Sequence, residues 1–171
     1  MLIITLLSMF VYSAAAEPEY YAELQAHIDD WLKPVAKTRL YGQRKKEAIA
    51  MIPTILKYCE MYNVDPLRIA ILISEENSWK QIGNGKKGEI GPLQVMPRLF
   101  RQFGLHTLDG QLHAGIYWFS EGMRRCNGNG AQANQWYFAS GKCRLVPSNR
   151  ARRRDRLYRR AVLKYRKKKE H

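Results

Sequence analysis

The sequence has few acidic residues, few cysteines and no extended low-complexity segment. Only 15 of its 171 residues are Asp or Glu, against 29 Lys and Arg, so the formal net charge is +14. An intrinsically disordered chain is excluded, because 46% of the residues are hydrophobic and 11% are aromatic. At this length we expect one domain with a substantial core. The excess of positive charge predicts an anionic partner.

Sequence signatures of metal, nucleotide and triad chemistry are also absent. The four histidines lack zinc spacing, and no Ser/His/Asp grouping is recognisable. The segment GNGKKG follows no predicted strand and lacks the Lys-Ser/Thr ending of a phosphate loop. We therefore expect no metal and no cofactor.

The first sixteen residues are apolar and uncharged. The apolar run over residues 2–12 is too short to cross a bilayer comfortably, and three alanines that form a small-residue cleavage pattern follow it. We interpret residues 1–16 as a signal peptide. An uncleaved anchor is the alternative, because no Lys or Arg precedes the run. Cleavage leaves no stable membrane span and predicts a periplasmic, cell-wall or extracellular protein.

Three cysteines follow this segment. Cys126 and Cys143 flank one short segment, and export permits a disulfide between them. By the loop-entropy relation, such a bond adds about 3 kcal/mol of stability. Cys59 has apolar neighbours, so we expect it to be a buried free thiol. The odd count leaves the pairing open.

Hydrophobic periodicity predicts a mainly α fold. Asp65 is placed to cap a helix with Pro66 at its first position. Residues 93–104 also read as a helix, and residues 81–92 as a loop or one small β-hairpin. The other predicted helices cover residues 20–33, 44–62 with a kink at Pro53, 66–79, 109–125, 131–138 and the segment after Pro147.

The predicted helix over 66–79 carries two acids at the end of an apolar stripe. The stripe that begins at Ile69 continues at helical spacing to Glu76, and Trp79 follows three residues later. Glu75 points about 100° away, so we expect it to be a solvated surface acid. Partial desolvation of Glu76 favours the protonated form that a general acid for glycosidic cleavage requires. The alternative is a helix that ends at Ser74 and leaves both acids exposed.

The segments EENSW and GEIGPLQVMP resemble the signature of the lytic transglycosylases with a lysozyme-like fold, the soluble lytic transglycosylase (SLT) family. That family has a Glu-Ser-x-aromatic step, then Gly-x-x-Gly-Leu-Met-Gln-aliphatic-Met-Pro, then Tyr-Asn-Ala/Ser-Gly. Residues 76–79 resemble the first motif, and residues 88–97 resemble the second at matching spacing. The resemblance covers about residues 46–165 and implies a lysozyme-like α-helical domain there.

The resemblance also implies a reaction and its residues. Glu76 would protonate the oxygen between N-acetylmuramic acid and N-acetylglucosamine, and would then accept the proton of the 6-hydroxyl as a 1,6-anhydro ring closes. The substrate's own N-acetyl group would stabilise the cationic centre. Ser78, Gln94, Met96 and Tyr137 would contact the glycan strand.

The sequence departs from the family pattern at three places. Asn77 replaces the usual Ser, Pro92 replaces a Leu, and the third motif, WYFASGKCR, lacks its Asn. Either Tyr137 or Phe138 takes the tyrosine position of that motif. We favour Tyr137, because its hydroxyl can form a hydrogen bond near the acid. A second carboxylate, which most glycosidases use, has no motif support.

We therefore expect a monomeric peptidoglycan lytic transglycosylase. A catalytically silent peptidoglycan-binding module of the same fold and a hydrolytic muramidase are the alternatives. Twelve Lys and Arg lie in residues 150–170, so we expect this C-terminal helix to bind anionic cell-wall polymers, unless it is only a solvated face. Export disfavours a nucleic-acid partner. The predicted organisation is a signal peptide over 1–16, an N-terminal helical extension over 17–45, the lysozyme-like domain over 46–165 and a basic tail over 166–171.

Overall fold

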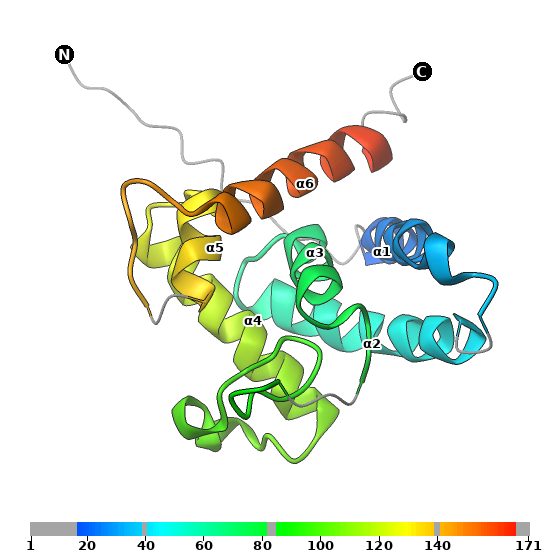
Figure 1. The fold of residues 1–171 in the computed structure, drawn as a ribbon, viewed down its shortest axis with the longest axis horizontal. Coiled ribbons are helices and arrows are strands. Elements are labelled where there is room, and N and C mark those ends of the chain that lie inside the picture. Colours follow the sequence, from blue (N-terminus) through cyan, green and yellow to red (C-terminus); the bar gives the residue numbers. More distant parts are fainter. Residues whose placement is uncertain (1–16, 39–40, 82–84, 139–140, 167–171) are drawn as a thin grey trace.

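The computed structural model describes residues 17–38, 41–81, 85–138 and 141–166. The predicted signal peptide and residues 167–171 of the predicted tail lie outside this part. The described chain is mainly helical, which confirms the predicted fold class (Figure 1). Its α-helices are α1 (Glu17–Leu32), α2 (Tyr41–Met61), α3 (Pro66–Asn77), α4 (Leu108–Arg125), α5 (Gly130–Phe138) and α6 (Asn149–Tyr165). Short 3-10 helices are η2 (Lys33–Val35), η3 (Pro97–Leu99) and η4 (Arg101–Phe103).

One hydrophobic core joins α1 to α5, and α1 is part of it although its residues precede the motif-bearing region. Helix α6 packs through a second, smaller cluster in which its Ala161 meets Leu67 and Ile71 of α3. Burial of these apolar faces supplies the main favourable free energy of folding. Fully buried side chains of the main core include Leu24, Ile28, Ile52, Ile55, Ile69, Leu72, Ile116 and Ala133.

Helix α3 begins as its sequence predicts. The Asp65 carboxylate accepts a hydrogen bond from the Leu67 N–H at 3.0 Å, and Pro66 occupies the first turn, where no N–H is needed. The helix ends at Asn77, because Ser78 turns into the left-handed region with φ 51°. Glu76 therefore lies in the last turn, and the alternative of a helix that ends at Ser74 is wrong.

The helix predicted over residues 93–104 is wrong. This segment contains only η3 and η4, and a single antiparallel bridge between Ile90 and Val95 stands where a hairpin was considered. Pro97 lacks an N–H for a helical hydrogen bond, and Gln94 has φ 49°, which breaks a regular right-handed helix. Within the described residues the chain forms no extended strand.

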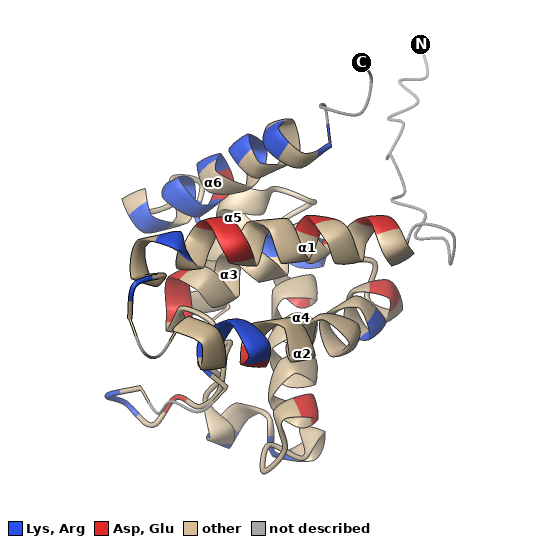
Figure 2. Ribbon diagram, turned by 90° about the vertical axis from the view of Figure 1, so that its right-hand side faces the viewer, with Lys and Arg blue, Asp and Glu red and all other residues tan. Residues whose placement is uncertain are grey.

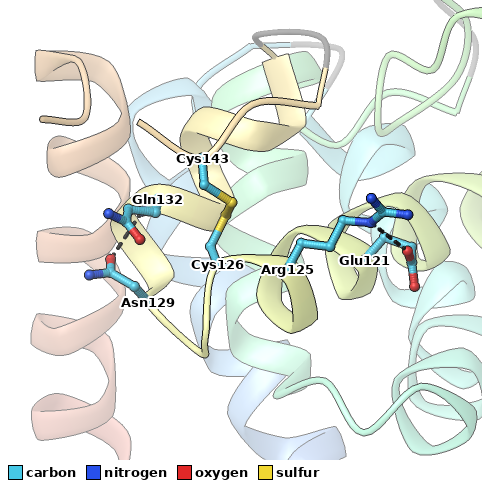
Figure 3. The surroundings of a disulfide bond; sticks show 6 residues. All are labelled: Glu121, Arg125, Cys126, Asn129, Gln132 and Cys143. Atoms are coloured by element: carbon cyan, nitrogen blue, oxygen red, sulfur yellow. Dashed lines mark hydrogen bonds and ion pairs between the residues drawn. A yellow bond between two sulfur atoms is a disulfide. The ribbon is translucent and has the colours of Figure 1, made fainter. Parts of the chain in front are cut away.

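The predicted disulfide between Cys126 and Cys143 is confirmed (Figure 3). Their Cα atoms are 5.6 Å apart, and the bond ties the end of α4 to the chain that follows α5. On the same end of α4, Arg125 pairs with Glu121. Cys59 is confirmed as a buried free thiol, and burial raises its pKa well above the usual range.

The end of α6 is held by ion pairs to α1 and to the cap of α3. Arg166, predicted as the first residue of a basic tail, pairs with Glu23 at 2.9 Å and with Asp65 at 2.8 Å. Both carboxylates are buried, with side chains 4% and 7% exposed. Lys164 pairs with Asp30. Arg166 is therefore part of the folded domain.

We predict that two truncated chains will distinguish the stabilising effect of these ion pairs from any effect of the residues after Arg166. A chain that ends at Arg166 keeps them, whereas a chain that ends at Leu163 leaves two buried carboxylates without their guanidinium. The free energy of unfolding in urea, followed by circular dichroism, should be about 3 kcal/mol lower for the shorter chain. Equal unfolding midpoints for the two chains would contradict a structural role of Arg166.

Candidate active site

A cleft of about 390 Å³ opens between the end of α3, the segment 85–100, α4, α5 and the start of α6. Four of the five predicted site residues line it: Glu76, Gln94, Met96 and Tyr137. They come from three segments that lie far apart in the sequence. The wall is also aromatic, with Phe100, Trp118 and Phe138.

Glu76 sits on the wall of this cleft, but its surroundings differ from the prediction. Its side chain is 12% exposed, and its two oxygens contact Arg154 at 2.6 Å and Arg150 at 2.9 Å. Trp79, expected beside the acid, is buried in the core. Glu76 is therefore an ion-paired carboxylate instead of an acid against an apolar wall.

Glu75 is also held by α6, so the expectation of a solvated surface acid is wrong. Its side chain is only 10% exposed, and Arg153 contacts it at 3.3 Å. Both acids thus face the arginines of a helix more than seventy residues away in sequence. Periodicity within α3 cannot report such partners, because it describes only one helix.

Tyr137 lies at the back of the cleft, but its hydroxyl does not contact Glu76. It donates a hydrogen bond to the Leu93 carbonyl at 2.6 Å. Burial, followed by the charge of Glu76, raises the pKa of the Tyr137 hydroxyl well above its usual range. Phe138 also lines the cleft, and its ring lies 5.1 Å from the guanidinium groups of both Arg150 and Arg154.

Asn77, which replaces the family's Ser, has a clear structural role. Its amide nitrogen donates to the Gly91 carbonyl at 2.9 Å and to the Lys80 carbonyl at 3.1 Å. The Gln94 amide donates to the same Gly91 oxygen at 2.8 Å. The Asn77 amide therefore joins the end of α3 to the segment that forms the opposite wall, and the Gln94 amide contacts the same carbonyl from within that segment.

Ser78 does not lie in the cleft, in contrast to its predicted role. It is the residue after α3, and its hydroxyl turns back toward the Ser74 carbonyl at 3.4 Å. The match to the first motif identified its position but not the direction of its side chain.

The cleft contains four charged residues that the motifs did not predict, namely Lys86, Lys87, Glu89 and Arg150. The Glu89 carboxylate accepts a hydrogen bond from the Lys87 N–H at 2.9 Å. Backbone N–H groups of Glu89 and Lys87 lower the pKa of this carboxyl. A Cβ atom at Gly85 would lie 2.2 Å from a Glu89 carboxylate oxygen. The glycine before the two lysines is therefore the sequence feature that could have indicated the close approach of Glu89.

The other acids without motif support lie outside the cleft. Asp109 accepts a hydrogen bond from the Tyr58 hydroxyl at 2.6 Å. Glu121 is paired with Arg124 and Arg125, which together lower its pKa to about 2. Glu89 is therefore the second carboxylate that shares the cleft with Glu76.

A buried hydrogen-bond network supports the end of α3 from behind. The Ser74 hydroxyl donates to the Ala70 carbonyl and accepts from the Trp79 indole at 2.8 Å. His27 Nε2 lies 3.0 Å from the same oxygen. Burial lowers the pKa of His27 to about 4.

Comparison of the chain with protein-family models and with curated proteins finds no match. Within the described residues, no group of three or more His, Cys, Asp and Glu side chains could hold a metal ion. None of the described helices is long and apolar enough to span a membrane.

We predict that His27 makes the fold sensitive to acid. Its pKa is about 4 when folded and about 6.5 when unfolded, so stability is fully present above about pH 6.5 and falls as the pH drops toward 4. The loss should reach about 3 kcal/mol below pH 4. Denaturant unfolding at several pH values should show a flatter profile for His27→Gln. The exposed His106→Gln variant should retain the wild-type slope, and an unchanged slope in His27→Gln would contradict this role.

Proposed function

We propose that this protein is a peptidoglycan lytic transglycosylase with a lysozyme-like domain. The observation that carries the proposal is the convergence of Glu76, Gln94, Met96 and Tyr137 on one cleft. The first two motifs predict Glu76, Gln94 and Met96, and the third, which lacks its Asn, predicts Tyr137. Since no family model or curated protein matches the chain, this convergence, with the motif resemblance, is the support for the proposal.

In the proposed reaction, a glycan strand lies along the cleft and places a glycosidic oxygen beside Glu76. A protonated Glu76 donates its proton to the leaving oxygen, and the substrate's N-acetyl group stabilises the cationic carbon. The Glu76 carboxylate then accepts the proton of the 6-hydroxyl as the anhydro bond forms. Phe100, Trp118 and Phe138 supply apolar faces on which sugar rings can pack.

Two alternatives have specific observations in their favour. Glu89 gives the cleft a second carboxylate, as a hydrolytic muramidase would use to activate water. The two ion pairs of Glu76 favour a silent glycan-binding module, because guanidinium groups occupy both of its oxygens. The products formed from peptidoglycan separate these functions.

We predict that Glu76→Gln lowers the release of 1,6-anhydro muropeptides from purified sacculi by at least about 100-fold, the usual size of a general acid's contribution. Mass spectrometry of the soluble products measures this release. Glu75→Gln is the matched control, because Glu75 lies in the same helix turn and outside the cleft, and it should retain activity.

The same digestion distinguishes the alternatives. Glu89→Gln should leave anhydro products intact if Glu76 acts alone. Products with reducing ends that disappear in Glu89→Gln would identify a muramidase. Absence of any soluble product from the wild-type protein would identify a binding module.

We further propose that the protein is exported and that α6 binds anionic cell-wall polymers. The disulfide supports an oxidising compartment. Figure 2 shows α6 at the edge of the molecule with repeated basic positions along it. Arg152, Arg156 and Arg160 are exposed and share one face at four-residue spacing, and none of them pairs with a described carboxylate. The apolar face of α6 is occupied by its packing on α3, so the outward surface is polar and positive.

We predict that replacing Arg152, Arg156 and Arg160 together with Gln weakens sedimentation with purified cell walls by about tenfold at low salt. The difference should shrink as salt rises, because exposed charges are screened. A matched triple of exposed cations on other elements, Lys37→Gln, Lys46→Gln and Arg101→Gln, removes the same charge and should bind better than the α6 triple. Equal binding by the two triple variants would show that only net charge matters, and would contradict a binding surface on α6.

A further inference from the structure

The cleft contains more positive charge than its own acids neutralise. Lys86, Lys87 and Arg150 line it together with Glu76 and Glu89. The Glu89 carboxylate accepts a backbone N–H and is also acted on by the charge of Lys87, and neither lysine lies within ion-pair distance of a described carboxylate. Both lysines are exposed at the cleft, so an anionic group that enters it would gain their attraction, whereas a neutral glycan would not.

Arg150 is placed to bind such a group. It is 50% exposed, and one of its terminal nitrogens contacts Glu76 Oε2 at 2.9 Å. A guanidinium has five N–H donors in a planar fork that matches a carboxylate. The guanidinium lies 5.1 Å from the Phe138 ring, which holds it at the cleft wall.

We propose that Arg150, with Lys86 and Lys87, binds a carboxylate of the substrate, and that this carboxylate competes with Glu76 for Arg150. The identity of the substrate rests on the proposed function: the peptides attached to muramic acid carry carboxylates, whereas N-acetylglucosamine polymers do not. The cleft would thus select peptide-bearing strands with free carboxylates.

The two arginines that contact Glu76 differ in exposure, so a substrate carboxylate can replace Glu76 as the partner of only one of them. Arg154 is 1% exposed, and its Nε and Nη1 have no hydrogen-bond partner, so it is fixed in the interior against Oε1. Arg150 is at the surface and can turn to a ligand. Binding of a substrate carboxylate therefore frees Oε2 and leaves Oε1 paired.

Glu76 lines the cleft, so release of Arg150 would leave its Oε2 open to the substrate. The charged and titratable groups around it are Arg154 and Arg150 from α6, Tyr137 from α5, Glu75 from α3, and Lys86, Lys87 and Glu89 from the segment 85–100. Among the arginines that contact Glu76, Arg150 alone is exposed enough to leave when substrate arrives.

Calorimetry with soluble disaccharide peptides tests this inference. Such small ligands report binding in the cleft, separately from the binding of wall polymers to the outer face of α6. The ligands are one muropeptide with free carboxylates and the same muropeptide with its carboxylates amidated. The wild-type protein should bind the free acid about tenfold more tightly, the effect of one charge-assisted contact. Arg150→Gln should abolish the preference. Arg101→Gln, which changes an exposed arginine of η4 outside the cleft lining, should retain it.

If the substrate carboxylate competes with Glu76 for Arg150, removal of the Glu76 charge should strengthen binding of the free acid. Glu76→Gln should bind the free acid about three- to fivefold more tightly than the wild type, because Arg150 loses its resting partner. Glu75→Gln should bind as the wild type does. Should Glu76→Gln not fold, the wild-type and Arg150→Gln comparison decides the matter alone.

No preference in the wild-type protein, no binding of either ligand, or a preserved preference in Arg150→Gln would overturn the inference. Failure of the proposed enzymatic function has a different signature. In that case sacculi release no soluble products, while the preference for the free acid and its dependence on Arg150 persist.

Discussion

A guanidinium that is 1% exposed requires a carboxylate, because an unpaired charge in the interior costs several kcal/mol. Arg154 meets this requirement with Glu76, and the pair joins α6 to the last turn of α3 at 2.6 Å. The contact that satisfies a buried charge is therefore also the one that fixes the candidate catalytic side chain. Undocking α6 would free Glu76, so the integrity of the site depends on the closing helix of the fold.

The basic residues of α6 serve two physical purposes that net charge alone cannot separate. Arg150, Arg153 and Arg154 turn toward the acids of α3. Others stand on the exposed face, where solvent screens them and an anionic partner can reach them. The formal charge of +14 thus overstates the field available for binding, because part of it is neutralised within the fold.

The sequence predicts most of the helices, and four of the residues that its motifs indicate line one cleft. Apolar periodicity located α3, and Asp65 with Pro66 marked its start. The helix predicted over residues 93–104 is wrong for two reasons: Pro97 lacks a helical N–H, which the sequence shows, and Gln94 adopts a positive φ, which the sequence does not show. The surroundings of Glu75 and Glu76 were misjudged for a different reason: their arginine partners are distant in sequence, and helical spacing is silent about tertiary contacts.

A single carboxylate that acts as acid and then as base has two opposed needs. It must hold a proton before bond cleavage, and it must be a stable anion afterwards. The unequal burial of the two arginines on Glu76 suits both stages. Arg154, fixed on Oε1, would stabilise the anion after proton transfer, while Arg150, half exposed on Oε2, can give way to substrate beforehand. The ion pairs that favour a silent site in the free protein are thus compatible with catalysis once a ligand occupies the cleft.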